Sequence, residues 1–379
     1  MPSSPPTDIG APLCAVDTPT LLIDLDAMTR NLERMAARVN ALGVRLRPHA
    51  KTHKSSAIAA KQIALGAVGV CCQKVSEAEA LVADGIGDVL ISNEVVGERK
   101  LGRLAALAKR TRIGACIDQP ESIGLLAEAA RAAGSRIDVL VEIDVGARRC
   151  GIAPGVAASA LAAEIVRCDN LRFAGLQAYH GSAQHLRTPQ ERHAAIDAAQ
   201  AAVTETLGHL MSAGFSCKTI GGAGTGTFLI EGSSGVWNEL QPGSYVFMDR
   251  DYARNTLDKG TNVPMFEHAL FVLATVMSSA SPEQAVIDAG HKALSNDSGF
   301  PAVWQRPDLN YHRPSDEHGV LTYADGAQRL AWGQKVLLVP GHCDPTVNLY
   351  DWYVGVRGFG TPEAHVETLW PVTTRGALT

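Results

Sequence analysis

A lysine-containing motif in the first part of the chain offers a nucleophile. Lys51 lies within His-Ala-Lys-Thr-His-Lys, which ends at Lys54. An amine flanked by other cations loses its proton more easily, and a neutral lysine can form a Schiff base with an aldehyde. Taken alone, the motif fits two ordinary surface lysines better than a nucleophile. Lys51 is therefore a candidate nucleophile whose meaning depends on the residues around it.

Two glycine-containing segments offer a place for a phosphate group. The run Gly221–Gly226 leaves backbone N–H groups uncrowded and includes the hydroxyl of Thr225, and Gly243-Ser244-Tyr245 offers a second such patch. Neither segment matches a P-loop or a dinucleotide-binding fingerprint. Each could alone be a tight turn, but two such loops after neighbouring strands would suit one phosphate group.

A third motif, Gly341-His342-Cys343-Asp344-Pro345-Thr346, supplies an imidazole and a carboxylate. In a strand or tight turn, side-chain alternation would direct His342 and Asp344 to the same side and Cys343 away from it. The pair makes half of a divalent-metal site, in which water and substrate complete the coordination of Mg²⁺ or Mn²⁺. A polar turn without a metal is the alternative interpretation.

The composition limits the classes of protein that remain. The chain has 379 residues, of which 46% are hydrophobic and 19% charged, and its formal net charge of -5 includes no long run of either sign. Nothing indicates binding to nucleic acid or to a membrane. No apolar run is long enough to span a bilayer, and residues 1–12 do not resemble a secretory signal. Eight scattered cysteines without a CxxC pair suit reduced thiols in the cytoplasm.

The elements that must position these motifs follow a regular rhythm from about residue 46 to 249. Short β-branched runs predict strands at Leu46–Ala50, Gly69–Cys72, Val89–Ser92, Ile113–Ile117, Ile137–Ile143, Phe173–Ala178, Lys218–Gly221 and Ser244–Met248. Helix-period runs between them predict helices such as Ser55–Ala64, Ser76–Ala83, Gly97–Ala108, Pro120–Ala133, Gly155–Val166 and Thr188–Ala213. Eight such units predict a (β/α)8 barrel, with a doubly wound open sheet as the alternative.

The rhythm changes after about Tyr252. Further strands are expected at Phe271–Met277, Ala285–Asp288 and Lys335–Val339, with no long helical pattern between them. This predicts a β-rich second domain, which the early strand Thr20–Leu25 is expected to join. The predicted division is residues 1–25 as a tail and strand joining the β domain, 26–255 as the barrel, and 256–379 as the β domain with the His-Cys-Asp motif.

The barrel would bring the candidate motifs together, because active residues in barrel enzymes follow the C-terminal ends of the strands. Lys51, Gln73, Arg149, Tyr179 and His185 all follow predicted strands in this way. Polar and titratable residues after several different strands favour one shared site over unrelated surface positions.

Four stretches closely resemble the D-threonine aldolase family. They are Arg47–Lys54, Cys71–Val75, Leu240–Tyr245 and Pro340–Thr346. The resemblance runs from about Thr18 to Trp370. This family is a branch of the alanine-racemase-fold (fold type III) pyridoxal enzymes that also contains 3-hydroxy-D-aspartate aldolases, D-threo-3-hydroxyaspartate dehydratases and D-serine dehydratases. It implies an N-terminal barrel that binds pyridoxal 5'-phosphate, a C-terminal β domain and a homodimer.

The resemblance also implies roles for individual residues. Lys51 matches the Schiff-base lysine, and His185 matches a histidine near the substrate hydroxyl. Arg149 matches an arginine near the phenolic oxygen of the cofactor, and Tyr179 matches a residue against its pyridine ring. The other implied cofactor-binding residues are Gln73, Thr225, Gly226, Gly243, Ser244 and Tyr245, and the implied metal ligands are His342 and Asp344.

The implied activity is retro-aldol cleavage of a D-3-hydroxy amino acid, such as D-threonine, to glycine and an aldehyde. The metal on His342 and Asp344 would lower the pKa of the 3-hydroxyl group, and His185 or a metal-bound water would remove its proton. Lys51 would help to return a proton to Cα. D-serine dehydratases carry cysteine at the position of Asp344 and use zinc, so the aspartate favours Mg²⁺ or Mn²⁺ and the aldolases.

Three alternatives stay open. The chain could be a 3-hydroxy-D-aspartate aldolase or a dehydratase of D-3-hydroxy amino acids, and the same ligands would serve either activity. From a different class, it could be a non-catalytic pyridoxal-binding protein, although the β domain argues against this. Two positions depart from the family pattern: His291 replaces an apolar residue, which could alter substrate selection, and Ala223 replaces a glycine in the phosphate loop.

Overall fold

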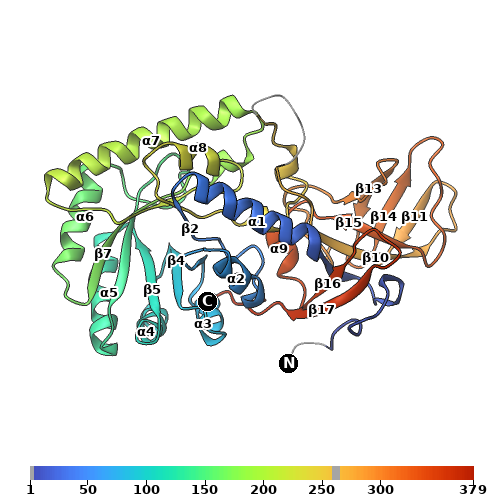
Figure 1. Ribbon diagram of the computed structural model, residues 1–379, viewed down its shortest axis with the longest axis horizontal. Coiled ribbons are helices and arrows are strands. Elements are labelled where there is room, and N and C mark those ends of the chain that lie inside the picture. Colours follow the sequence, from blue (N-terminus) through green and yellow to red (C-terminus); the bar gives the residue numbers. More distant parts are fainter. Residues whose placement is uncertain (1–3, 258–264) are drawn as a thin grey trace.

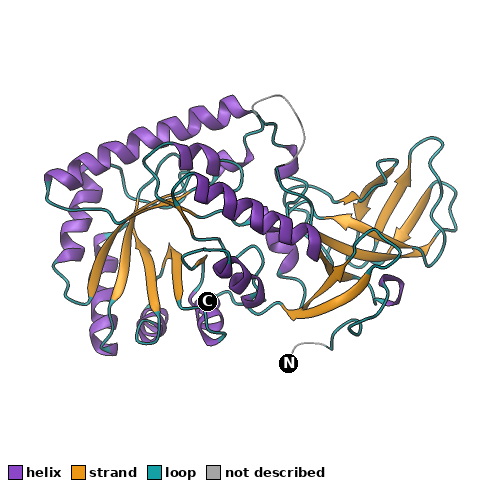
Figure 2. Ribbon diagram, in the orientation of Figure 1, coloured by secondary structure: helices purple, strands orange, loops and turns teal. Residues whose placement is uncertain are grey.

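The structure is a computed structural model that describes residues 4–257 and 265–379. It contains two sheets that lie next to each other, an eight-stranded parallel sheet and a nine-stranded, mostly antiparallel sheet (Figure 1). Helices surround the parallel sheet, whereas the region around the other sheet contains mainly strands and loops (Figure 2). No helix in the described part of the chain is long and apolar enough to cross a membrane.

The parallel sheet has the strand order of a barrel. Its strands are β2 (Arg45–Leu46), β3 (Val70–Cys72), β4 (Asp88–Glu94), β5 (Arg112–Ile117), β6 (Ile137–Glu142), β7 (Leu171–Ala178), β8 (Thr219–Gly222) and β9 (Glu239–Leu240). They follow one another in the order β2-β9-β8-β7-β6-β5-β4-β3. A parallel bridge between His49 and Cys71 joins the two ends of this order. The predicted (β/α)8 barrel is therefore confirmed, and the doubly wound alternative is excluded.

The helices begin and end where local sequence signals place them. Those around the barrel are α2 (Ser56–Ala64), α3 (Val75–Ala83), α4 (Glu98–Leu107), α5 (Pro120–Ala133), α6 (Val156–Val166), α7 (Pro189–Ser212) and α8 (Phe228–Ser233). Helix α5 starts with a proline, which needs no N–H partner in the first turn, and stops at Gly134 in a left-handed conformation. Helix α7 starts with a capping box formed by Thr188 and Glu191.

One predicted strand is wrong. Residues Ser244–Met248 do not form a strand, because Ser244–Val246 is a short 3-10 helix and the eighth barrel strand is β9. Pro242 follows β9 and has no N–H group to continue the ladder. The N–H group of Phe247 then donates to the carbonyl of Ser244, 3.2 Å away, so the chain turns where the apolar run predicted extension.

The nine-stranded sheet includes a strand from the start of the chain. Its strands are β1 (Thr20–Asp24), β10 (Leu270–Ser278), β11 (Gln284–Ile287), β12 (Ala302–Val303), β13 (Leu309–Pro314), β14 (Gly319–Tyr323), β15 (Lys335–Val339), β16 (Trp352–Arg357) and β17 (His365–Pro371). Strand β1 pairs with β10 and β16 in the middle of the sheet. The Asp24 carboxylate then caps helix α1 (Leu25–Ala41), which leads the chain into the barrel.

Both ends of the barrel are polar, and an apolar layer lies between them. Buried apolar side chains fill its interior at Cys71, Leu90, Cys116, Leu140 and Ala174. At the N-terminal end, Arg47 pairs with Glu239 and Asp88, each at 2.7 Å. The C-terminal end instead opens onto a cavity, so the strand ends present their polar residues there.

Candidate active site

A cavity of about 460 Å³ lies at the C-terminal end of the barrel. All the predicted site residues line it except Gly226 and Tyr245. Most of them come from the barrel, but His342 and Asp344 come from the start of helix α9 (Cys343–Val347), which follows β15. The structure therefore brings the lysine, phosphate-loop and His-Cys-Asp motifs to one place.

Lys51 and Asp344 meet inside this cavity. Lys51 Nζ lies 3.0 Å from Asp344 Oδ2. The Asp344 carboxylate is the largest influence on the pKa of Lys51 and raises it. The sequence-based expectation of a destabilised ammonium group is therefore wrong for the protein without cofactor. Neighbouring cations do act on Lys51, since Arg149 lowers its pKa, but the carboxylate outweighs them.

The donor set around Asp344 fits a metal ion. Burial alone would raise the pKa of Asp344, but Lys51 and His342 lower it to about 2, so the carboxylate is charged. Its Oδ1 atom is buried and has no hydrogen-bond partner among the described residues. The Thr52 hydroxyl lies nearby and favours the charge, yet it does not reach hydrogen-bond geometry. A buried charged oxygen without a donor is suited to binding a cation.

The second candidate ligand, His342, is oriented by a carboxylate. Its Nδ1 lies 2.8 Å from Asp297 Oδ2, which leaves Nε2 as the available ring nitrogen. Metal-ligating histidines commonly hydrogen bond in this way through the other nitrogen. Strand alternation does not bring His342 and Asp344 together as expected. His342 is instead the extended residue before α9, and Asp344 lies in the first turn of that helix.

Arg149 and Tyr179 lie together on another wall of the cavity. The Arg149 guanidinium is 5.5 Å from the centre of the Tyr179 ring, a cation–π distance. Arg149 Nη2 also lies 3.9 Å from Glu142 Oε1 behind it. Burial is the main reason that the pKa of Tyr179 is raised, which keeps the phenol neutral. An aromatic face beside a cation suits a flat, anionic ring.

The two predicted phosphate loops are joined by a hydrogen bond. The backbone N–H group of Tyr245 donates to Thr225 Oγ1 at 3.0 Å. The Tyr245 side chain points away from the cavity, because its hydroxyl accepts a hydrogen bond from Gln62. Gly243 lines the cavity, where a Cβ atom would lie 2.5 Å from Thr52 Oγ1. Only glycine leaves this wall open, so the cradle fits a phosphate group.

Gly226 and Ala223 shape the first loop from outside the cavity. The Gly226 N–H group donates to Gln184 Oε1 at 2.9 Å. Ala223 has a φ of 68°, a left-handed conformation that costs an alanine more than a glycine. His291 lies outside the cavity lining, and its ring contacts Asn296 at 3.0 Å.

His185 faces the cavity at the end of a 3-10 helix, η2 (Ser182–His185). Its Nδ1 lies 2.7 Å from Asp251 Oδ2, and Arg187 binds the other oxygen of that carboxylate. His185 and Lys51 therefore give the cavity two side chains that can move protons.

Comparisons with known proteins agree with this geometry. A family model described as alanine racemase, N-terminal domain, matches residues 23–251, and a serine dehydratase domain model matches residues 269–356. A D-threonine aldolase of an Arthrobacter species is 46% identical over 98% of this chain and 96% of its own length. A 3-hydroxy-D-aspartate aldolase of Paracoccus denitrificans is 46% identical over 95% and 92%. The crystal structure of D-threonine aldolase from Filomicrobium marinum is 55% identical, with a TM-score of 0.95, and the match covers 99% of this chain and 100% of that one.

The chain belongs to the D-threonine aldolase family. As a member, it has the alanine racemase fold, and the family supports pyridoxal 5'-phosphate as the cofactor.

Several residues at the site were not predicted from the sequence. His49 lines the cavity next to Lys51, and its Nε2 lies 2.8 Å from Gln73 Nε2. Burial and then Lys51 lower its pKa well below the usual range, so the ring is neutral. The spacing of two residues between His49 and Lys51 is a signal that could have found it. No spacing in the sequence links Asp251 to His185 or Asp297 to His342, because each aspartate lies in a segment distant in sequence from its histidine.

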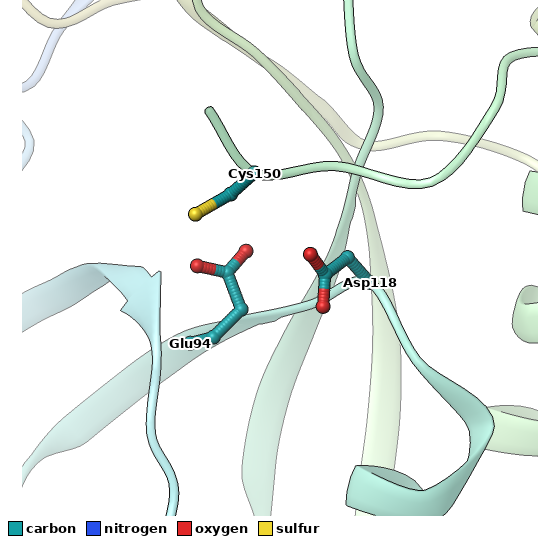
Figure 3. Close-up of side chains that lie close together, drawn as sticks. All are labelled: Glu94, Asp118 and Cys150. Atoms are coloured by element: carbon teal, nitrogen blue, oxygen red, sulfur yellow. The ribbon is translucent and has the colours of Figure 1, made fainter. Parts of the chain in front are cut away.

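An acidic cluster lies beside Arg149 at the barrel rim. Glu94, Asp118 and Cys150 point toward one another, with a ligand atom of each within 4.8 Å of the others (Figure 3). Burial and the neighbouring Glu94 raise the pKa of Glu142 to about 8. Glu142, which lies next to Glu94, also contacts Arg149 and so supports the arginine from behind the cavity wall. The predicted metal ligands of this family member are not part of the cluster.

Proposed function

We propose that this chain cleaves D-3-hydroxy amino acids of the D-threonine type to glycine and an aldehyde, using pyridoxal 5'-phosphate and a divalent metal. The observation that carries this proposal is the Asp344 carboxylate, which lies between Lys51 and His342 and has a buried oxygen without a hydrogen-bond partner among the described residues. Relatives named as aldolases, which match nearly the whole chain, support the same reaction class.

The cofactor would be held by residues on three sides of the cavity. Thr225, Gly243 and Ser244 would hold the phosphate, with Gly226 and the backbone of Tyr245 shaping the loops. Tyr179 would lie against the ring, and Arg149 and Gln73 would contact its phenolic side. Lys51 would anchor the aldehyde carbon.

The remaining residues would bind the substrate and move its protons. His342 and Asp344 would hold Mg²⁺ or Mn²⁺ and so fix the position of the 3-hydroxyl group. His185 would take the proton of that hydroxyl as Cα–Cβ cleavage begins, and Lys51 would help to return a proton to Cα. When bound, the cofactor supplies an electron sink and the metal lowers the pKa of the hydroxyl.

Further properties belong to the same proposal. Residues 1–25 and 256–379 would form the β domain and 26–255 the cofactor-binding barrel, in agreement with the place of β1 in the nine-stranded sheet. The protein would act as a homodimer in the cytoplasm, where its eight free cysteines would stay reduced.

The test is a product assay on purified protein supplied with pyridoxal 5'-phosphate and Mn²⁺. We expect D-threonine to give glycine and acetaldehyde. If D-3-hydroxyaspartate reacts faster and gives glycine and glyoxylate, the activity stands but the preferred substrate is different. A 2-oxo acid with ammonia in place of glycine would replace the aldolase with a dehydratase. L-Threonine serves as the stereochemical control.

A further inference from the structure

The hydrogen bond of His185 determines which of its ring nitrogens can act as a base. His185 Nδ1 faces Asp251 Oδ2 at 2.7 Å, and its ring packs beside Tyr252 with the ring centres 6.0 Å apart. Nε2 lies across the ring from this contact. A neutral imidazole carries one proton, and the partner of each nitrogen decides where that proton resides.

Asp251 is itself held in a defined orientation by Arg187. The Asp251 side chain is 7% exposed. Arg187 Nη2 donates to its Oδ1, and Arg187 Nη1 donates to the Asp251 carbonyl at 2.7 Å and to Asn255 Oδ1 at 2.8 Å. Although burial alone would raise the pKa of Asp251, Arg187 and His185 lower it, so the group is a carboxylate that can only accept. One oxygen is committed to Arg187 and the other to His185.

We propose that Asp251, clamped by Arg187, is a positioning residue that keeps the His185 proton on Nδ1 and leaves Nε2 free to accept the proton of the substrate 3-hydroxyl. This inference rests on the proposed function, because it gives His185 the role of general base. Carboxylates orient catalytic imidazoles in the same way in serine hydrolases, where they fix the tautomer. Neither Asp251 nor Arg187 touches the reacting atoms.

Asp251→Asn tests the proposal by reversing the polarity of one contact. Arg187 can only donate, so the new amide must turn its oxygen toward Arg187 and its NH2 group toward His185. His185 Nδ1 must then accept, and the proton moves to Nε2. We expect kcat for D-threonine to fall by about 10²- to 10⁴-fold, as for the equivalent change in a serine protease, with a small change in KM.

A double variant separates this effect from a general structural one. In Asp251→Asn/Arg187→Met the donor is gone, so the amide can turn its oxygen toward His185 and restore the proton to Nδ1. We expect kcat at least tenfold above that of Asp251→Asn alone. If Asp251 merely held the loop together, removing Arg187 as well would lower activity further, and that result would overturn the proposal.

The tautomer can also be observed without turnover. ¹⁵N NMR of the cofactor-loaded protein, with the His185 signals assigned from their loss in His185→Gln, reports which nitrogen is protonated. We expect a protonated Nδ1 in the original protein and a protonated Nε2 in Asp251→Asn. A protonated Nε2 in the original protein, or the same tautomer in both, contradicts the inference. If the tautomers are as expected but the protein forms no glycine, the proposed function is contradicted and the inference about Asp251 is not.

Discussion

Lys51 and Asp344 form an ion pair across the cavity, with Nζ 3.0 Å from Oδ2, and so link the barrel to helix α9. Each group stabilises the charge of the other: the pKa of Lys51 is raised and that of Asp344 is lowered. To bond with an aldehyde, Lys51 must lose its proton and with it this partner. The Asp344 carboxylate then has no lysine partner and can bind a metal ion instead. Cofactor binding and metal binding should therefore favour each other.

Lys51→Met should therefore have two effects of opposite sign. It should abolish the absorbance band near the visible edge that a lysine-bound cofactor gives, because no amine remains to bind the aldehyde. It should also make the cofactor-free protein bind Mn²⁺ more tightly than the original chain, because Asp344 has lost its competing cation. Absorbance spectra and Mn²⁺ titration measure these effects.

Lys54→Met is the matched control for the same motif. Lys54 forms a buried pair with Glu77 at 2.5 Å and does not line the cavity, so this variant should lose stability but keep the absorbance band at temperatures where it is folded. A band that survives in Lys51→Met would remove the central role of Lys51, and unchanged or weaker Mn²⁺ binding would remove the competition between the two cations.

The metal ligands can be tested separately from the residue that orients them. Asp344→Asn should remove metal-dependent turnover while the cofactor band remains. Asp297→Leu keeps both ligands but removes the acceptor for His342 Nδ1–H, so metal affinity should fall about 10- to 100-fold. Dialysis against a chelator followed by Mn²⁺ titration gives both affinities. Glu94→Gln, in the acidic cluster, is the control and should keep its metal. If Glu94→Gln loses the metal and Asp344→Asn keeps it, the metal site lies at the acidic cluster and not at Asp344.

The barrel could be predicted from sequence because short runs rich in buried, apolar residues alternate with helix-period runs along this part of the chain. The run of β6 was predicted as Ile137–Ile143, and its hydrogen-bonded strand is Ile137–Glu142. The same signal failed at Ser244–Met248, where the residues are also buried but the chain turns. Apolar side chains report burial, and only the hydrogen bonds after Pro242 distinguish a strand from a buried turn.

The site was predictable where a residue follows a strand and not where it comes from a loop. Lys51 and Gln73 follow strands, and both line the cavity as expected. Asp297 and Asp251 act by holding His342 and His185, and these contacts arise only from the packing of distant segments. The sequence also did not show where the Tyr245 side chain points. Tyr245 belongs to a predicted phosphate loop, but its ring packs against Phe266, with the ring centres 5.6 Å apart.

The ionic end of the barrel should contribute strongly to stability. Arg47→Met would leave the Glu239 carboxylate, whose side chain is 3% exposed, without its 2.7 Å partner and with only the more exposed Arg45 at 3.2 Å among the ion pairs of the described residues. Removing one member of a buried pair typically costs about 3–5 kcal/mol. The exposed pair of Lys292 and Glu317 is the control, and Lys292→Met should leave the free energy of unfolding nearly unchanged. Urea denaturation measures both, and equal effects would show that burial does not decide the cost.

Glu142 should make the protein less stable as the pH rises toward 8. Its pKa is raised from the usual 4.5 to about 8, because burial and then Glu94 disfavour its charge. The folded protein therefore holds this proton more tightly than the unfolded chain between these two values. The stability that it contributes is complete below pH 4.5 and is lost as the pH rises through 8.

Glu142→Gln cannot ionise, so its urea midpoint should rise relative to that of the original protein between pH 5 and pH 8. The divergence is at most about 1.4 kcal/mol per pH unit for one proton. Glu191→Gln is the control: the Thr188 side chain lowers the pKa of this exposed group, so its titration is complete below the tested range. Its curve should run parallel to that of the original protein. Parallel curves for Glu142→Gln as well would mean that Glu142 is already charged behind Arg149, and that the arginine outweighs both burial and the neighbouring Glu94.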